Sequence, residues 1–334
     1  MDSNFGVPAP PMHAYYDPQN TIYAECILII VGLIVVGFAT RDSIRFKTVL
    51  PVTVALSGVF CVFPEVFIDV LGGCLWPTSP GHVAFKILGR EMTWFPVTAW
   101  FAFGALLTYI CFGMMLREVK TKWIWVAFAV AGCMDIVFEE IMLNVRGLYV
   151  YYGHQPLVLL TKFPWWWLPI NTAGLFLAAA LAYRYRQHLH GWKAAIMFPL
   201  TPFAYMAVHG FAGMPADAVI NGDYSWIITQ AGGIATSLLC LVATALMIHL
   251  VLERNPFRLN ATNIGIGTSS KTAADKAAPL CAAVEFDEGS GLFSAKAEKV
   301  EDSEGNMTIN RNAAKPRDQI KTEVEPTSVG DAVR

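Results

Sequence analysis

The sequence contains few charged residues. Only 15% of its 334 residues are charged and 55% are apolar, whereas an ordinary soluble domain contains about 25% charged residues. The charges are also unevenly placed, since residues 1–252 contain 26 of them and the shorter segment 253–334 contains 24. The sequence therefore predicts a charge-poor membrane domain followed by a hydrophilic segment, and it argues against a single soluble globular domain.

Patterns that would indicate a particular chemistry are missing as well. The seven cysteines are scattered without a CxxC pair, no glycine-rich phosphate loop or GxSxG turn occurs, and residues 226–252 contain no lysine for a retinal Schiff base. No HxxHH or ExxH arrangement for a di-iron site is present. The net charge of −2 arises wholly in the hydrophilic segment, which gives no basis for nucleic-acid binding. We therefore expect no metal, no other cofactor and no nucleic-acid partner.

Seven apolar stretches are long enough to cross a lipid bilayer, which takes about 20 residues. They lie at residues 21–40, 49–71, 93–116, 123–143, 163–183, 194–211 and 226–252. Residues 253–334 are rich in Ala, Lys, Glu, Asp and Thr and lack apolar periodicity, which is typical of a disordered tail. The predicted fold is an all-α integral membrane protein with a seven-transmembrane-helix bundle over residues 21–252.

Basic residues alternate between the two sets of connecting loops. Nine lie on one side of the predicted bundle: Arg41, Arg45, Lys47, Arg117, Lys120, Lys122, Arg184, Arg186 and Lys193. Four lie on the other side, in longer loops: Lys86, Arg90, Arg146 and Lys162. The positive-inside rule then predicts that residues 1–20 are extracytosolic and the C-terminal tail is cytosolic. We expect a multi-pass protein of the plasma membrane or endoplasmic reticulum, and the sequence leaves its oligomeric state open.

Acidic residues of the predicted bundle gather near its outer end. Glu65 and Asp69 lie at the end of the second apolar stretch, and Asp135, Glu139 and Glu140 lie at the end of the fourth. Other strongly polar residues of the bundle lie at the same end: Glu25, Asn171, His209, Asp217, Thr229 and Gln230. Because acids inside a membrane are costly, each is a functional candidate by default.

Two spacings indicate which of these acids act together. Glu65 and Asp69 are four positions apart, and so are Asp135 and Glu139, which places each pair on one face of its helix. Carboxyls crowded in a low-dielectric pocket cannot all be ionised. A protonated acid is then expected beside an ionised base, as general acid–base catalysis requires. We predict Glu139 and Asp135 as the acid–base pair, with Glu65 as the partner across the pocket.

Structural explanations compete with functional ones for the remaining acids. An acid at a helix end can reach the headgroup region or pair with an arginine, and this is the simpler explanation for Glu25 and Asp217. Either explanation fits Asp69 and Glu140, which we include among the expected substrate contacts.

The same choice arises for His209 and for the tryptophans at 165–167. His209 can be a hydrogen-bonded structural histidine or a substrate contact. The tryptophans at 165–167 can anchor a helix at the membrane interface or form a substrate wall. We predict that Trp166, Asn171 and His209 contact the substrate.

Four short motifs stand out between residues 135 and 215. They are Asp135-xxx-Glu139, Gly147-Leu-Tyr149-Val-Tyr151, Phe163-Pro164 followed by three tryptophans, and Ala207-Val-His-Gly-Phe211 followed by Pro215. With these motifs, residues 20–252 resemble the AveC-like spirocyclase family. That family is named for a membrane protein of polyketide biosynthesis that closes a dihydroxy-ketone into a spiroketal.

The resemblance implies a cofactor-free cyclase or isomerase, spirocyclase-like or dehydratase-like, in secondary metabolite biosynthesis. Its partners would be the lipid bilayer and a lipophilic, hydroxylated small-molecule substrate such as a polyketide or terpenoid. The loop at 147–151 would fold over the pocket mouth, with Tyr149 and Tyr151 as hydrogen-bond donors. Alternatives are a membrane terpene cyclase and a non-enzymatic seven-helix lipid-binding sensor or transporter. A proton-coupled transporter would need acids that continue to the cytosolic end, where the predicted helices contain almost none.

Overall fold

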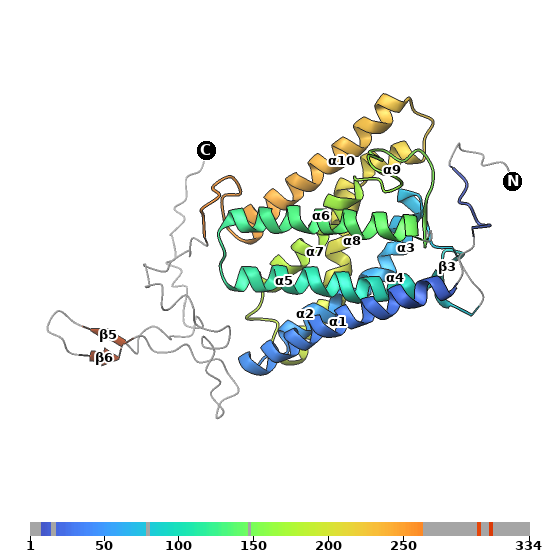
Figure 1. The fold of residues 1–334 in the computed structure, drawn as a ribbon. Coiled ribbons are helices and arrows are strands. Elements are labelled where there is room, and N and C mark those ends of the chain that lie inside the picture. Colours follow the sequence, from blue (N-terminus) through green and yellow to red (C-terminus); the bar gives the residue numbers. More distant parts are fainter. Residues whose placement is uncertain are drawn as a thin grey trace, which may run out of the picture. The chain divides into compact units, whose positions relative to one another are not determined.

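The chain divides into two units, Met1–Pro279 and Leu280–Arg334. The computed structural model describes residues 8–14, 18–77, 81–145, 148–262, 299–301 and 307–309. The first unit is a helical bundle (Figure 1). In the second unit, strands β5 (Lys299–Glu301) and β6 (Met307–Ile309) pair antiparallel, within the segment for which the sequence predicts disorder. Residues 263–298, 302–306 and 310–334 of the predicted disordered tail lie outside the described residues.

Each of the seven predicted stretches contains helix, but the helix of the fifth begins at Trp167 and not at residue 163, because Pro164 still pairs with Val158 in a β-bridge. The α-helices are α1 (Pro18–Phe46), α2 (Leu50–Ser57), α3 (Val62–Gly72), α4 (Trp94–Ala99), α5 (Ala105–Leu116), α6 (Thr121–Val145), α7 (Trp167–Arg184), α8 (Met197–Ala212), α9 (Met214–Ile220) and α10 (Trp226–Leu246). Short 3₁₀ or π segments join or extend several of them: η1 (Gly58–Cys61), η2 (Trp100–Gly104), η3 (Gly191–Ile196) and η4 (Met247–Val251).

Five continuous helical segments are long and apolar enough to cross a membrane. They are Thr21–Phe46, Leu50–Gly72, Trp94–Leu116, Gly191–Ala212 and Trp226–Val251. The predicted helical, membrane-embedded character of the protein is confirmed at this level.

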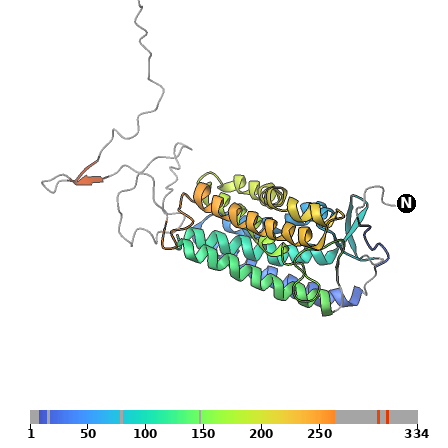
Figure 2. The same cartoon turned by 90° about the horizontal axis from the view of Figure 1, so that it is seen from above.

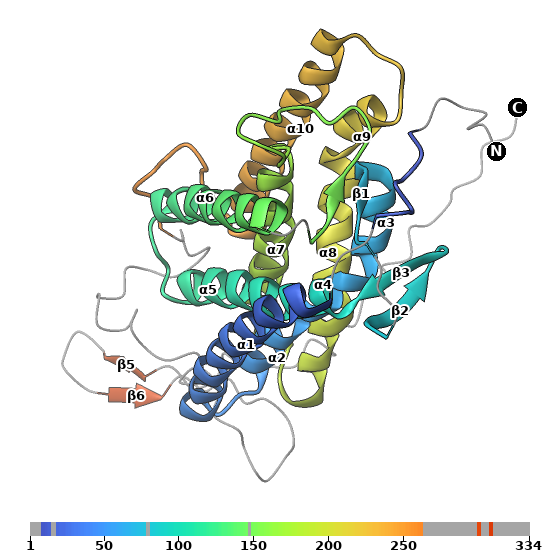
Figure 3. The same cartoon turned by 45° about the vertical axis from the view of Figure 1, so that its right-hand side comes forward.

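Helix α7 lies in the middle of the bundle. It packs against α5, α6, α8 and α10, as Figure 3 shows. Its sequence explains this position, because its many alanines and Gly174 allow other helices to approach closely. A Cβ atom at Gly174 would lie 2.7 Å from the Cα atom of Tyr205 on α8. This close contact sets where Tyr205 lies relative to α7.

A second close contact joins η1 to η2. A Cβ atom at Gly58 would overlap the carbonyl carbon of Gly104, so only glycine allows the two backbones to approach in this way. Beyond η1, helix α3 ends at Gly73, which has the left-handed conformation of a helix C-cap (φ 67°) and donates its N–H to the carbonyl of Asp69. The chain therefore leaves α3 directly after the turn that carries Asp69.

Short strands cover one end of the bundle, which we call the strand end (Figure 2). Strand β1 (Cys74–Leu75) pairs antiparallel with β4 (Val150–Tyr151), and β2 (Val83–Ile87) forms a hairpin with β3 (Arg90–Thr93). The hairpin turn has positive φ at Leu88 and Gly89, as a type I′ turn requires. The pairing of β1 with β4 holds the loop after α6 against the end of α3.

The opposite end of the bundle is closed by the first residues after η4. The indole N–H of Trp125 donates to the carbonyl of Pro256 (3.0 Å), and the amide of Thr121 donates to the carbonyl of Ala261 (2.9 Å). Arg254 is buried and donates to the carbonyl of Val119. Residues 253–262 are therefore ordered, which corrects the predicted start of the disordered tail at residue 253.

Candidate functional site

Four carboxyl side chains from two helices lie buried near the strand end, and we call them the carboxyl cluster. Helix α3 carries Glu65 and Asp69, and α6 carries Asp135 and Glu139. Their exposed fractions are 8%, 1%, 2% and 8% in that order. Glu65 interacts electrostatically with the other three. The structure thus brings together the three predicted catalytic residues and Asp69.

A chain of hydrogen bonds connects the two helices of the cluster through α8 and α7. The hydroxyl of Tyr205 on α8 lies 2.9 Å from Oε2 of Glu65 and 3.1 Å from Oδ1 of Asn171 on α7. The amide nitrogen of Asn171 donates to Oδ2 of Asp135, at 3.3 Å. Glu65 and Asp135 are therefore linked through two neutral side chains.

Glu139 is held by the loop that follows α6. Its Oε2 accepts hydrogen bonds from the hydroxyls of Tyr149 (2.5 Å) and Tyr151 (3.2 Å). Burial, followed by the charge of Glu139, raises the pKa of both phenols well above the ordinary value, so both remain protonated donors at neutral pH. Both hydroxyls donate to Glu139 in the structure, and their predicted role as donors to a substrate stays a prediction.

Asp69 accepts a hydrogen bond from the segment that follows β1, the strand that pairs with β4. The indole N–H of Trp76, just after β1, donates to Oδ2 of Asp69 at 2.7 Å. The Trp76 ring lies against the Tyr149 ring, with 4.5 Å between centroids. Within the described part of the chain, Oδ1 of Asp69 is buried without a hydrogen-bond partner. The Cys74 thiol also interacts with the Asp69 carboxyl, so a ligand at this carboxyl would compete only with a weak thiol donor.

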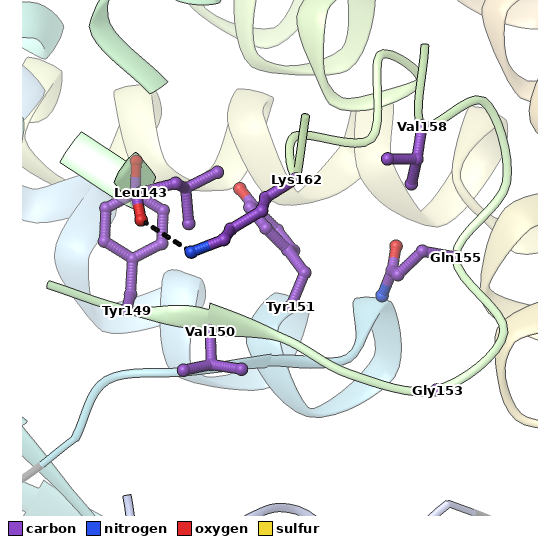
Figure 4. Close-up of a pocket in the computed structure, with 8 residues that line it drawn as sticks. All are labelled: Leu143, Tyr149, Val150, Tyr151, Gly153, Gln155, Val158 and Lys162. Atoms are coloured by element: carbon purple, nitrogen blue, oxygen red, sulfur yellow. Dashed lines mark hydrogen bonds between the residues drawn. The ribbon is translucent and has the colours of Figure 1, made fainter. Parts of the chain in front are cut away.

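A pocket of about 470 Å³ opens beside the cluster. This volume lies within the range of about 300–1,000 Å³ that is usual for small-molecule sites. Its lining is Leu143, Tyr149, Val150, Tyr151, Gly153, Gln155, Val158 and Lys162 (Figure 4). Lys162 donates to the carbonyl of Leu143 at 3.3 Å, near the end of α6. Because Tyr149 and Tyr151 line the pocket and also bond Glu139, they form the boundary between the pocket and the carboxyl cluster.

His209 is buried but has a different partner. Its Nε2 lies 3.1 Å from Oδ2 of Asp217, and its ring lies 6.3 and 6.0 Å from the rings of Trp166 and Trp167. Asp217 thus pairs with a histidine, whereas the simpler explanation from the sequence was a headgroup contact or an arginine pair. The structure does not bring His209 into a hydrogen bond with the cluster.

Trp166 is not an interfacial anchor. Its exposed fraction is 0%, whereas Trp94 and Trp226 are 50% and 75% exposed. The Trp166 indole N–H donates to Oε1 of Gln155 at 3.2 Å, and Gln155 lines the pocket. Of the two explanations that the sequence left open, an interior wall fits Trp166, and the membrane belt fits Trp94 and Trp226.

Two further acids lie away from the cluster. Glu140 bonds the side chains of Thr161 and Asn144 on the more exposed side of α6. Glu25 pairs with His82 at 2.7 Å. The structure therefore does not place Glu140 with the other predicted substrate contacts, and Glu25 pairs with a side chain that the sequence did not indicate.

Sequence reasoning missed two members of the site. Tyr205 precedes His209 by four positions and so shares its helix face, but nothing in the sequence links that face to Glu65. Trp76 lies in a loop without a pattern. In the ranges that the structure describes, no three His, Cys, Asp or Glu side chains form a group that could hold a metal ion.

A search with protein-family models finds no match to this chain, and searches among curated proteins and among solved structures find none either. The resemblance to AveC-like spirocyclases therefore stays a prediction. The function has to be argued from the site itself.

Proposed function

We propose that the protein is a membrane-embedded cyclase or isomerase that acts on a lipophilic, hydroxylated small molecule by carboxyl acid–base catalysis. The observation that carries this proposal is the buried carboxyl cluster beside a pocket of ligand size. Buried acids inside a membrane protein cost folding free energy, so they are retained where they serve function. Spirocyclisation or dehydration of a polyketide or terpenoid fits such a site, in agreement with the resemblance in the sequence.

The chemistry needs one proton donor and one proton acceptor near the same substrate. A protonated carboxyl gives its proton to a ketone or departing hydroxyl, and a carboxylate takes the proton of the attacking hydroxyl, so that spiroketal formation releases one water. Glu139 and Asp135 form the proposed pair, and Glu65 lies across from them. Tyr149 and Tyr151 line the pocket and hold the Glu139 carboxyl behind its wall.

Remaining polar groups near the cluster would orient the substrate. Oδ1 of Asp69 and the indole N–H of Trp167 are buried without hydrogen-bond partners among the described residues. Oδ1 of Asp69 can accept a hydrogen bond from a substrate hydroxyl, and the Trp167 N–H can donate one to a substrate hydroxyl or carbonyl. Asn171, Trp166 and His209 complete the proposed substrate contacts.

We also propose that α6 and α7 cross the membrane, which makes seven spans. Helix α6 has 25 residues, which at about 1.5 Å per residue exceeds a hydrocarbon core of about 30 Å. By the positive-inside rule, the basic loops then favour a strand end outside the cytosol and residues 253–262 on the cytosolic side. The plasma membrane and the endoplasmic reticulum both fit this arrangement.

A proton-coupled transporter is supported less well by the distribution of acids. Neither α2 nor residues 121–134 of α6 contain an acidic residue, so the cluster has no acidic path toward the basic end. A membrane terpene cyclase would use the same buried acids and differs from a spirocyclase only in its substrate. A lipid-binding sensor would use the pocket without any reaction.

The test compares lipophilic extracts of cells that express the wild type, Glu139→Gln or the control Glu118→Gln, by mass spectrometry. Glu118 lies in the loop before α6 at the opposite end, and its substitution removes the same charge. We expect an isomeric or water-shifted product in the wild type and the control, and its loss with Glu139→Gln at equal membrane abundance. Identical extracts from all three would contradict the catalytic role of Glu139 and favour a sensor.

A further inference from the structure

The hydrogen-bond chain Glu65–Tyr205–Asn171–Asp135 restricts where its protons can lie. The Tyr205 hydroxyl has one hydrogen, yet it lies within hydrogen-bond distance of two acceptor oxygens, Oε2 of Glu65 and Oδ1 of Asn171. It can donate to only one of them at a time. The Glu65 and Tyr205 side chains are buried, so an oxygen–oxygen contact without a hydrogen between the atoms would cost about 1–3 kcal/mol.

One arrangement satisfies every contact in the chain. A protonated Glu65 donates to the Tyr205 oxygen, Tyr205 donates to Oδ1 of Asn171, and the Asn171 N–H donates to Asp135. Asp135 then acts only as an acceptor, which an ionised carboxylate does best. These contacts therefore require one acidic proton, at the Glu65 end.

The contacts require the same number of acidic protons if the Asn171 side-chain amide is rotated by 180°, which exchanges its oxygen and its nitrogen. Its N–H would then donate to Tyr205, Tyr205 would donate to an ionised Glu65, and a protonated Asp135 would donate to the Asn171 oxygen. The acidic proton then lies on Asp135 instead of Glu65, and the contacts still require only one. Asn171 thus decides which of the two carboxyls is the acid.

We infer that Tyr205 and Asn171 are positioning residues that hold one proton on the Glu65–Asp135 pair, with the proton on Glu65 in the orientation observed. This inference rests on the proposed function and deepens it, because it would make Asp135 the proton acceptor of the Glu139–Asp135 pair and Glu65 a second proton donor across from it. The placement of the proton itself depends on the hydrogen bonds alone.

Infrared difference spectroscopy on the full-length protein in lipid nanodiscs tests the placement. A protonated carboxyl has a carbonyl-stretch band that a carboxylate lacks. We expect Glu65→Gln to remove one such band and Asp135→Asn to leave it, since the side-chain amide introduced by Glu65→Gln can still donate to Tyr205. Tyr205→Phe should shift the same band by removing the acceptor of the Glu65 proton, and Glu118→Gln should change nothing.

Three outcomes would overturn the inference. The band could be lost with Asp135→Asn and kept with Glu65→Gln, it could survive both substitutions, or it could stay unshifted in Tyr205→Phe. If Glu65→Gln fails to fold, the Tyr205→Phe shift decides alone. The readout needs no substrate, so expected bands together with unchanged cell extracts would reject the proposed function and leave the proton placement standing.

Discussion

At the scale of single residues, the two phenols on Glu139 have unequal geometry. The Tyr149 hydroxyl lies 2.5 Å from Oε2 of Glu139 and Tyr149 is 2% exposed, whereas the Tyr151 contact measures 3.2 Å. A shorter and more buried hydrogen bond to a carboxyl should contribute more to holding it. The two tyrosines are therefore not equivalent, although the sequence presents them as a symmetrical Tyr-Val-Tyr motif.

Replacing each phenol by phenylalanine should lower product formation by different factors. We expect a loss of about 10-fold to 100-fold for Tyr149→Phe, since a hydrogen bond to a charged group contributes about 1.5–3 kcal/mol and about 1.4 kcal/mol is tenfold. Tyr151→Phe should cost only about 3-fold. Product per unit of membrane protein, measured by mass spectrometry, checks the order. Equal effects of the two substitutions, or an equal loss in the exposed control Tyr185→Phe, would contradict it.

The raised pKa of Tyr149 also predicts how stability depends on pH. Burial keeps the folded phenol protonated above its ordinary pKa of about 10, while the unfolded phenol loses its proton there. Stability should therefore be unaffected below about pH 10 and fall as the pH rises above it, by about 1.4 kcal/mol per pH unit for one such group. Unfolding of detergent-solubilised protein at about pH 9 and about pH 11 should show a shallower fall in Tyr149→Phe. Equal slopes in both proteins would refute this.

At the scale of elements, the sequence predicted the helices and the pairing of acids on two helix faces. The i, i+4 spacing alone identifies Glu65 with Asp69 and Asp135 with Glu139 as pairs. It could not identify Tyr205, because the position of Tyr205 depends on the close packing of α8 on Gly174 of α7. Two-residue strands carry no pattern, so the pairing of β1 with β4 was also not predictable.

Close helix contacts give a direct test of this packing. A methyl group at Gly58 would meet the Gly104 backbone, whereas one at Gly37 would meet nothing within 4 Å. Gly58→Ala should destabilise the fold by about 1–3 kcal/mol or more, as overpacking does. Gly37→Ala should be neutral, or stabilising by up to about 1 kcal/mol from helix propensity. Thermal unfolding midpoints in detergent compare the two, and equal midpoints would show that the η1–η2 contact is not tight.

At the scale of the whole molecule, Lys162 distinguishes seven spans from five. With seven spans, Lys162 and Lys86 lie on one side of the membrane and Lys120 lies on the other. If α6 and α7 do not cross, Lys162 lies with Lys120 instead. The strand end already brings the loop before Lys162 together with β1 through the β1–β4 pairing, which favours seven.

Single cysteines at these three positions, in a variant without native cysteines, report their sides to a membrane-impermeant thiol reagent. We expect Lys86→Cys and Lys162→Cys to react in intact cells or sealed vesicles from the extracytosolic face. Lys120→Cys should react only after permeabilisation. Labelling of position 162 together with position 120 would contradict the seven-span arrangement and the proposed location of the pocket.

The most direct measurement of the central claim uses purified protein in nanodiscs and the lipophilic precursor that accumulates with Glu139→Gln. The wild type should convert this precursor, without added cofactor, into an isomer or a product lighter by one water, and Glu139→Gln should not. Mass spectrometry of the reaction over time reads out both. An unchanged precursor in the presence of folded wild-type protein would contradict the claim that the carboxyl cluster is catalytic.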